Sequence, residues 1–331
     1  MVLNLKIGIV GLPNVGKSTL FNALTNAGAL AANYPFATIE PNIGIVPVPD
    51  ERLNTLAKMY ETNKIIPATV EFVDIAGLVA GASKGEGLGN KFLAHIRECQ
   101  AICHVVRAFK NNDIVRADNK PEDDIIKQAK DDIDIINLEL QLADEETKAK
   151  IAAKRKKDPT DENIPYLTDK PVIYMFNVDE NGLTDENLQA QLKNLIAPNE
   201  AIFVNAKLEE EMSGMDRTER QEFLQSYGVK NDALGELIQA AYKTLGLQSF
   251  LTAGKKECRA WTIKQGATAP EAAGTIHTDF QRGFIAASIC NFNDLKELGS
   301  EQAVKAAGKL RLEGKTYVMQ DGDVVEFKFN V

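Results

Sequence analysis

The sequence is poor in cysteine and histidine, and the few that it has form no metal-binding pattern. It holds four cysteines and three histidines among 331 residues. No two cysteines form a C-x-x-C pair and no histidine stands at zinc-ligand spacing beside them, which argues against a zinc finger or a disulfide framework. We therefore expect four reduced cysteines in the core: Cys99, Cys103, Cys258 and Cys290.

Long hydrophobic runs and an excess of positive charge are also lacking. No apolar stretch approaches the roughly 20 residues that cross a bilayer, and residues 1–10 lead directly into a glycine-rich loop. This predicts a cytoplasmic protein without a membrane partner. The formal net charge of -9 argues against a uniformly basic nucleic-acid-binding protein, although a local patch could contact RNA.

What the sequence does have is an alternation of apolar strands and helical stretches. With 44% hydrophobic residues, a chain of this length can bury a full core and typically forms about two domains. Strand-like runs occupy residues 5–10, 68–75 and 101–108, and they resume at 171–176 and 201–204. This rhythm predicts an α/β fold with a doubly wound, mostly parallel sheet.

Between residues 113 and 168 the alternation stops. Apolar residues recur there at helical spacing from Ile125 to Ile151, which predicts a helical insertion. Residues 148–157 carry six positive side chains and no acidic one. This basic end could meet a phosphate backbone, or it could be an ordinary solvated helix face.

The residues after about 247 form a separate, nearly neutral module. Residues 248–331 hold 11 Lys and Arg against 10 Asp and Glu. A small mixed sheet with a helix is predicted, with strands at 258–263, 283–289, 316–319 and 325–331 and a helix at 301–312. The predicted domains are 1–112 together with 169–247 for the sheet, 113–168 for the insertion, and 248–331 for this module.

The most informative motif is G-L-P-N-V-G-K-S at residues 11–18, which completes the pattern G-x-x-x-x-G-K-[ST] between a strand and a helix. A strand that turns sharply through glycines into a helix points backbone N–H groups into one concavity, where they hold phosphate oxygens. A chance glycine turn would not show the full spacing. The predicted phosphate-binding residues are Asn14, Val15, Gly16, Lys17, Ser18 and Thr19, with the Lys17 ammonium on the outer phosphates of a nucleotide triphosphate.

Three residues are candidates for a magnesium site. The Ser18 hydroxyl would ligate the ion, and Asp74 would support it from the end of a strand, in a D-x-x-G pattern. Thr38 would add a second hydroxyl, or it is an ordinary loop threonine. Gly77 would lie near the terminal phosphate.

No catalytic group is assigned. Leu78 follows Gly77 at the point where Ras-like enzymes carry a glutamine that orients the attacking water. Leucine cannot orient water, so unaided turnover should be slow, on the order of 10⁻⁴ to 10⁻² per second. The glycine-rich residues 77–89 suit a segment that orders with a ligand or partner, or a merely flexible surface loop.

Base recognition is expected at Asn177, Val178 and Glu180, after the strand at 172–176. Guanine-specific enzymes show N-K-x-D there, and this chain has valine for the lysine and glutamate for the aspartate. The change breaks the guanine clamp and makes adenine plausible, because mismatched donors and acceptors cost several kcal/mol. The base pocket would be completed by Asn205, Ala206 and Lys207.

The YchF/Obg-like ATPases are the family that these motifs resemble. The similar segments are residues 11–18, N-Y-P-F-A-T-I-E-P-N at 33–42, D-I-A-G-L-V at 74–79 and G-A-S-K-G-E-G-L-G-N at 81–90, with A-W-T-I at 260–263 and H-T-D-F-Q-R-G-F-I at 277–285 similar to the TGS domain of that family. The resemblance implies a P-loop domain with a coiled-coil insertion and a C-terminal β-grasp TGS domain. It also implies ATP rather than GTP, replacement of the catalytic glutamine by Leu78, and association with ribosomes.

The chain departs from this family at two points. The insertion at 113–168 is shorter than usual, so the arm is shortened here or the chain is incomplete. Arg116 stands where many members have a histidine, and an arginine there could stabilise developing phosphate charge. Asn14 has a counterpart in other enzymes, since related potassium-stimulated hydrolases use an asparagine at this loop position. Potassium is therefore a further candidate cofactor beside magnesium.

The leading hypothesis is a slow, magnesium-dependent ATP hydrolase that acts as a switch on the ribosome, specifically its large subunit, or on structured RNA. A monomer is expected. The alternatives are a GTPase of the same class and a ribosome- or RNA-binding regulator in which hydrolysis is incidental. Ribosomes should raise turnover under the first reading and leave it unchanged under the last.

Overall fold

The structure is a computed structural model, and it describes residues 5–31, 42–75, 88–110, 124–155, 166–230 and 232–330. The chain forms two compact units. The N-terminal unit comprises residues 5–46 and 71–241, and the C-terminal unit comprises residues 47–70 and 242–331.

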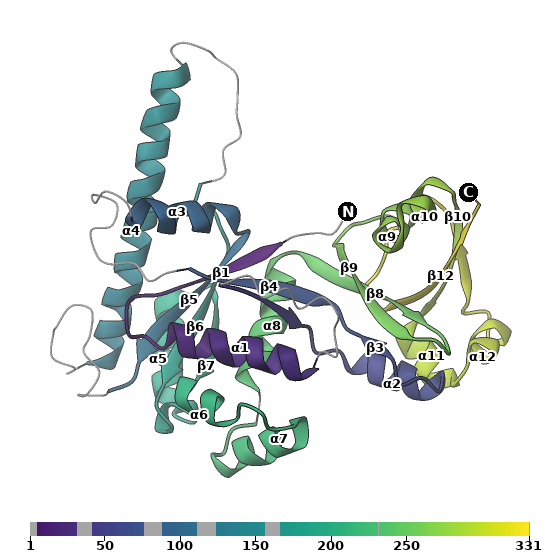
Figure 1. The fold of residues 1–331 in the computed structure, drawn as a ribbon, viewed down its shortest axis with the longest axis horizontal. Coiled ribbons are helices and arrows are strands. Elements are labelled where there is room, and N and C mark those ends of the chain that lie inside the picture. The colour runs from purple at the N-terminus through teal and green to yellow at the C-terminus, as the bar shows by residue number, and fades with distance from the viewer. Residues whose placement is uncertain are drawn as a thin grey trace. The chain divides into compact units, whose positions relative to one another are not determined.

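The N-terminal unit is built on a six-stranded sheet, which confirms the predicted α/β fold (Figure 1). In spatial order its strands are β2 (Ile43–Pro47), β4 (Thr69–Asp74), β1 (Lys6–Val10), β5 (Ala101–Ala108), β6 (Val172–Val178) and β7 (Glu200–Val204). The pairings of β1 with β4 and β5, of β5 with β6 and of β6 with β7 are parallel. Because parallel strands end at the same edge, their polar C-terminal residues gather there.

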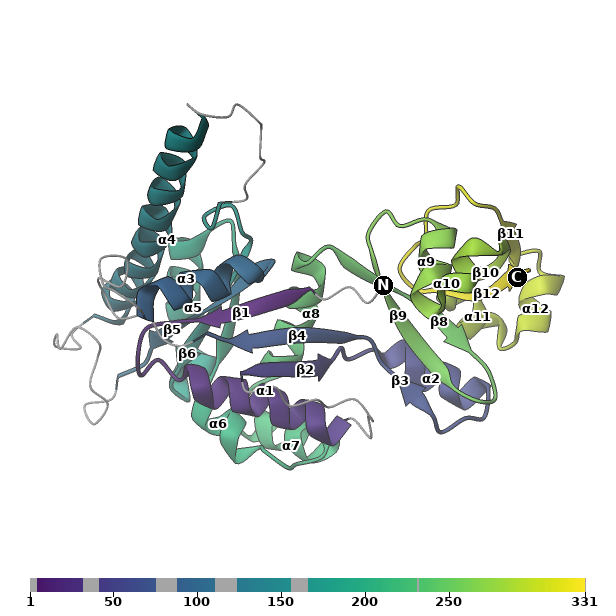
Figure 2. The ribbon, with the colours of Figure 1, turned by 45° about the horizontal axis from the view of Figure 1, so that its top comes forward.

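Helices complete the N-terminal unit: α1 (Lys17–Ala31), α3 (Leu88–Glu98), α4 (Ile125–Arg155), α5 (Glu186–Ile196), α6 (Ala206–Glu211), α7 (Arg217–Ser226) and α8 (Ala233–Thr244). Several begin at a residue whose side chain accepts a hydrogen bond from the first turn, such as Asp185, Asn205 and Asp216. The helices α1 and α6 lie side by side (Figures 1 and 2).

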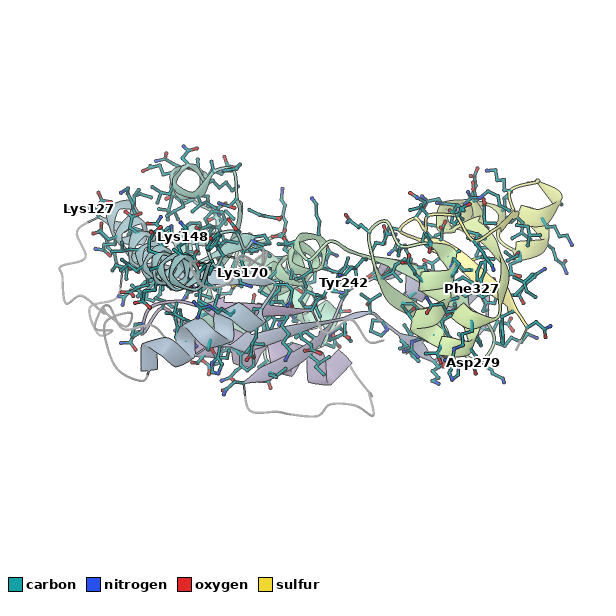
Figure 3. The ribbon with its side chains drawn as sticks, turned by 90° about the horizontal axis from the view of Figure 1, so that it is seen from above. Lys127, Lys148, Lys170, Tyr242, Asp279 and Phe327 are labelled. Atoms are coloured by element: carbon teal, nitrogen blue, oxygen red, sulfur yellow. The ribbon has the colours of Figure 1, made fainter. Side chains whose placement is uncertain are left out.

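The insertion contains one long helix, α4, of 31 residues. Its first half packs on the sheet through Ala129, Ile133, Ile136 and Leu140, which follow the predicted helical spacing. Its far end projects away from the sheet in Figure 1, and Lys127 and Lys148 mark its course in Figure 3. Within residues 124–155 and 166–168 no second helix lies beside it, so the described part of the insertion does not form the expected coiled coil.

A buried carboxylate of α4 binds the backbone at residues 167–168, at the end of the predicted insertion. The side chain of Asp144 is 3% exposed, and it accepts hydrogen bonds from the backbone N–H groups of Leu167 and Thr168 and from the Thr168 hydroxyl, at 2.8 to 2.9 Å. Three donors satisfy a charge that would otherwise be costly to bury. Lys148 lies one turn further along the helix and pairs with Glu145 at 2.8 Å.

The C-terminal unit holds a second six-stranded sheet, and it is mixed, as predicted. In spatial order the strands are β11 (Arg311–Glu313), β10 (Phe284–Asn291), β12 (Asp323–Phe329), β8 (Leu247–Ala253), β9 (Cys258–Lys264) and β3 (Ile65–Ile66). The β10–β11, β10–β12 and β8–β9 pairs are antiparallel, whereas β8–β12 and β3–β9 are parallel. The helices are α2 (Glu51–Met59), α9 (Ala269–Ile276), α10 (Thr278–Arg282), α11 (Phe292–Leu298) and α12 (Glu301–Ala306).

The segment 47–70 folds with the C-terminal unit, although the sequence pattern assigned it to the first domain. Arg52 at the start of α2 pairs with Asp50 at 2.8 Å and with Asp321 at 2.7 Å. Strand β3 then adds an edge to β9 (Figure 2). The Arg52–Asp321 pair and the pairing of β3 with β9 are non-local, so no local pattern in residues 47–70 predicts them.

Two predicted elements of the C-terminal unit are wrong. The helix predicted at 301–312 ends at Ala306, because Gly308 takes a φ of 69° and its N–H bonds back to Lys305. Residues 311–313 then form β11. The segment predicted as a strand at 316–319 makes a single bridge, from Val318 to Thr268.

Candidate nucleotide-binding site

The loop between β1 and α1 has the backbone of an anion-binding concavity. Asn14 and Gly16 have φ values of 64° and 93°, in the left-handed region. Alternation of such residues with ordinary ones turns successive N–H groups to the same side. Helix α1 begins at Lys17 with no acidic residue in its first turn, so the positive end of its dipole meets no negative side chain of its own.

The side chain of Asn177 bridges three segments of this site. Its Nδ2 donates to the Val15 carbonyl at 2.9 Å, and its Oδ1 accepts from the Ala206 N–H at 3.0 Å. A Cβ at Gly16 would collide with this amide, so glycine is required there by space as well as by φ. Asn177 was predicted to face the base, and what the structure shows is a link between the phosphate loop, β6 and α6.

Lys17 and Asp74, both predicted from the sequence, are brought together. The parallel pairing of β1 with β4 sets Asp74 opposite Ile9, close to the start of the loop. The Lys17 ammonium pairs with Asp74 Oδ1, and the two side chains are 9% and 17% exposed. In this structure the predicted phosphate-binding cation and the predicted metal-supporting carboxylate therefore neutralise each other.

The other loop and metal candidates are only partly described. Asn14 and Ser18 are exposed, Thr19 is half-buried, and Val15 is buried. Thr38, Gly77 and Leu78 lie outside the described residues, as do Arg116 and most of the glycine-rich loop.

Magnesium fits the donors that are described. Within the described residues no group of three or more His, Cys, Asp or Glu side chains could hold a metal ion. A hydroxyl at Ser18 and a carboxylate at Asp74 are nevertheless the hard oxygen donors that magnesium prefers, and this ion commonly needs only one or two protein ligands beside substrate phosphates and water.

The predicted base-binding residues separate into exposed and buried groups. Glu180 is exposed, and Lys207 is 77% exposed, with its ammonium 3.9 Å from Glu211. Asn205 caps α6 by accepting from the Leu208 N–H. Val178, in contrast, is 1% exposed.

The burial of Val178 corrects its predicted role. Its side chain packs in a core cluster with Phe176, Leu192 and Ile196, so it presents no surface to a base. The next side chain along, Asp179, accepts from the Gly182 N–H at 2.9 Å and shapes the turn after β6. A valine in place of lysine removes a donor from this position but adds no base contact.

A buried ion pair behind α6 was not predicted. Glu209 is 3% exposed and accepts from Arg220 at 2.7 Å, and Arg220 also pairs with Asp232 at 3.1 Å. Burial raises the pKa of Glu209 to about 7, and the neighbouring guanidinium opposes that rise. The pair ties α6 to α7 and so supports Ala206 beneath Asn177. Glu209 lies in α6 and Arg220 in α7, and no pattern in the sequence predicts that these two helices pack together.

The cysteines are free and buried, as expected. Burial raises the pKa of Cys103 to about 12 and that of Cys99 and Cys290 to about 11, so these thiols stay protonated and unreactive. His104, in β5, is also buried, and burial lowers its pKa to about 3. Of the helices that the structure describes, none is both long enough and apolar enough to span a bilayer.

Two family models match the chain. YchF-GTPase_C, described as a protein of unknown function (DUF933), matches residues 247–330, and MMR_HSR1, described as 50S ribosome-binding GTPase, matches residues 6–177. The second match contains the whole phosphate loop and ends at Asn177.

Curated relatives match over the full length. The chain is 47% identical to the "Ribosome-binding ATPase YchF" of Haemophilus influenzae, with 99% of this chain and 100% of the relative covered. The protein of the same name from Bacillus subtilis is also 47% identical, with the same coverage.

Solved structures agree. The "Schizosaccharomyces pombe YchF GTPase" aligns with a TM-score of 0.85 at 34% identity and covers 98% of each chain. A GTP-binding protein from Pyrococcus horikoshii OT3, at 19% identity and a TM-score of 0.58, shares the fold. The chain therefore belongs to the YchF family of P-loop nucleotide hydrolases.

Proposed function

We propose that this chain is a slow, magnesium-dependent ATP hydrolase that binds the ribosome and works as a nucleotide-controlled switch. One observation carries the proposal: the loop at 11–18 has left-handed backbone conformations at Asn14 and Gly16, which suit an anion-binding concavity, and its Lys17 pairs with Asp74 at the end of β4. The curated relatives carry the name "Ribosome-binding ATPase", which supports ATP as the substrate and the ribosome as the partner.

The preference for ATP rests on the residues after β6. Glu180 replaces the aspartate of the guanine-binding pattern, and its exposed carboxylate sits one methylene further from the backbone. The names of the relatives differ on this point, because the Schizosaccharomyces pombe structure is called a GTPase. Competition between ATP and GTP for one site tests the preference, and tight GTP with weak ATP would reject it.

Magnesium would neutralise charge on the outer phosphates. Ser18 and Asp74 would hold it, with Thr38 as the third candidate, and Lys17 would turn from Asp74 to the phosphates. Potassium is a second candidate, because Asn14 is an exposed residue of the loop. Equal rates in potassium and sodium would reject that role. We assign no catalytic group, since Leu78 cannot orient water.

The remaining features describe how the switch would meet its partner. The alignment with the Haemophilus influenzae relative spans 369 positions, 38 more than the 331 residues of this chain. We place this shortening in the insertion, where the described residues hold one helix. The C-terminal unit would be the TGS domain and would dock a cytoplasmic monomer on the large ribosomal subunit, with the basic residues 148–157 as a second contact.

The deciding experiment titrates a nucleotide panel against the full chain with and without purified ribosomes. We expect magnesium-dependent ATP binding, slow hydrolysis, and faster hydrolysis when ribosomes are added. Turnover that ribosomes leave unchanged would favour a binding protein in which hydrolysis is incidental. Absence of ATP and GTP binding would reject both readings.

A further inference from the structure

We propose that Arg259, stacked on Trp261, forms a platform that binds an unpaired RNA base, with Lys255 and Lys256 holding the adjoining phosphates. We call these four residues the Arg259 platform. The inference rests on the proposed function, because a ribosome is the source of the RNA. It adds a defined contact surface and the chemical form of RNA that this surface fits.

The indole ring of Trp261 is fixed on one face and at one edge. Its ring lies nearly parallel to that of Phe250, at an interplanar angle of 10° and a centroid distance of 6.3 Å. Its Nε1 donates to the Thr252 hydroxyl at 2.9 Å. The Arg259 guanidinium carbon sits 3.7 Å from the centroid of the indole, so a cation is layered on the ring.

The backbone beneath the platform is held on both sides. Strand β9 lies between β8 and β3 (Figure 2). Arg259 in β9 is paired with Thr252 of β8 and with Ile66 of β3. A side chain that rises from a strand paired on both sides stays where it is placed better than one on a loop. The stack is therefore a preformed surface.

Arg259 differs from other arginines in the way that it is held. Arg52 and Arg220 each contact two carboxylates, at 2.7 to 3.1 Å. Among the described residues no acceptor bonds the Arg259 guanidinium and no carboxylate pairs with it, although the side chain is half-buried. Its N–H donors therefore stay available to a ligand.

The surroundings of the stack are positive in a chain whose net charge is -9. Residues 253–264 contain Lys255, Lys256, Arg259 and Lys264 against one acid, Glu257. That acid is already paired, because Glu257 accepts from Lys64 at 2.6 Å. Lys255 and Lys256 are exposed at the tip of the β8–β9 hairpin. A polyanion would meet several uncompensated charges here.

The geometry favours RNA over an acidic peptide. A carboxylate needs only charge and donors, whereas a flat cation layered on a fixed ring offers a stacking surface that a nucleobase matches. The lysines act as point charges for phosphates. Bases within a duplex are stacked on each other and cannot reach the platform, so the ligand is an unpaired base in a single strand or loop.

The test uses the full chain, a labelled single-stranded RNA oligonucleotide without secondary structure, and the duplex of the same sequence. Trp261 is the one tryptophan of the chain, so its intrinsic fluorescence reports on the platform. We expect the single strand to change Trp261 emission and the duplex to leave it unaltered. Arg259→Gln should weaken single-strand binding about tenfold, since stacking on one base is worth a factor of this order.

Two further variants separate stacking from charge. Arg259→Lys keeps the charge, loses the flat guanidinium, and should also weaken binding. Arg282→Gln removes an equal charge from an exposed position in α10 and should leave affinity nearly unchanged. Equal losses at Arg282 and Arg259, full affinity in Arg259→Lys, or equal displacement of RNA by polyglutamate would each overturn the proposal. Circular dichroism of every variant checks that it is folded.

Failure of this inference can be told from failure of the proposed function. ATP hydrolysis and sedimentation of the native chain with ribosomes test the function without any variant. If both occur and the Arg259 variants bind RNA like the native chain, the platform is rejected and the function stands. If the native chain does not sediment with ribosomes, the proposed partner is rejected whatever the variants show.

Discussion

Lys17 and Arg259 are two cations whose settings differ, one in each unit. Lys17 is nearly buried and its charge is matched by Asp74, within the same site. Arg259 is half-buried, it is layered on a ring, and no carboxylate of the residues that the structure describes pairs with it. A ligand must compete with a carboxylate to engage Lys17, but it meets Arg259 in a conformation that is already formed.

The difference suggests two modes of control. At the phosphate loop a metal ion can take over the carboxylate while phosphate takes the lysine, so metal and nucleotide should assist each other. At the platform no protein group has to be displaced, so binding should depend on salt, through the release of counterions from the RNA, and on the RNA strand rather than on nucleotide. Four predictions test the first half of this comparison and the packing on which it depends.

The largest effect is expected for Lys17→Ala. Loss of charge-assisted hydrogen bonds to phosphate should weaken ATP binding by about 100-fold, near 3 kcal/mol. Calorimetric titration with ATP and magnesium measures it. Lys127→Ala, at an exposed position on α4, is the control and should bind as the native chain does. ATP affinity unchanged in Lys17→Ala would remove the basis of the proposed function.

Asn177→Ala should have the next largest effect. It leaves the buried Val15 carbonyl and Ala206 N–H without their partner, at a cost of about 2 kcal/mol in the free energy of unfolding. ATP affinity should fall with it, because the loop loses its support. Asn177→Asp keeps the acceptor for Ala206 but buries a carboxylate oxygen against the Val15 carbonyl, so it should lose more. Urea denaturation of both variants measures the order, and a reversed order would contradict the bridging role.

His104 is a buried, neutral side chain, and its effect on the free energy of unfolding should depend on pH. Its Nε2 has no partner among the described residues, and its folded pKa of about 3 lies below the unfolded value near 6.5. Below pH 6.5 the unfolded chain therefore binds a proton that the folded chain cannot. The contribution of the neutral His104 to the free energy of unfolding is therefore fully present above pH 6.5. It is lost as the pH falls below that value, by about 1.4 kcal/mol per pH unit.

His104→Leu should remove that dependence. Denaturation of the native chain and the variant between pH 7.5 and 5.5, about one unit on either side of the unfolded pKa, measures it. The two stabilities should diverge as the pH falls, with the variant favoured. Parallel curves would show that His104 takes up its proton in the folded state.

Asp74→Asn should give the smallest change and the sharpest test of the comparison. Without magnesium, release of Lys17 should strengthen ATP binding by about two- to fivefold, a modest gain because Asp74 keeps some contact with water. With magnesium, the gain in ATP affinity that we expect for the native chain should shrink in the variant. An equal dependence of ATP affinity on magnesium in the native chain and in Asp74→Asn would show that Asp74 does not support the metal.

The sequence predicted the site better than it predicted the supports of the site. The loop at 11–18, the sheet and the strand-end position of Asp74 follow from local patterns of glycines and apolar runs. The bridging by Asn177 and the burial of Val178 do not, because both depend on which strands become neighbours. The segment 47–70 illustrates the same limit, since its partners are about 200 residues away or more along the chain.

The two cations show the division most clearly. The sequence alone determined that Lys17 follows a phosphate-binding loop, because the turn from strand to helix is a local property of glycine and of spacing. Only the tertiary structure decided that Lys17 meets Asp74 and that Arg259 meets a ring and, within the described part of the chain, no acid. Charge partners are chosen by the register of paired strands, and that register is set by the packing of the whole sheet.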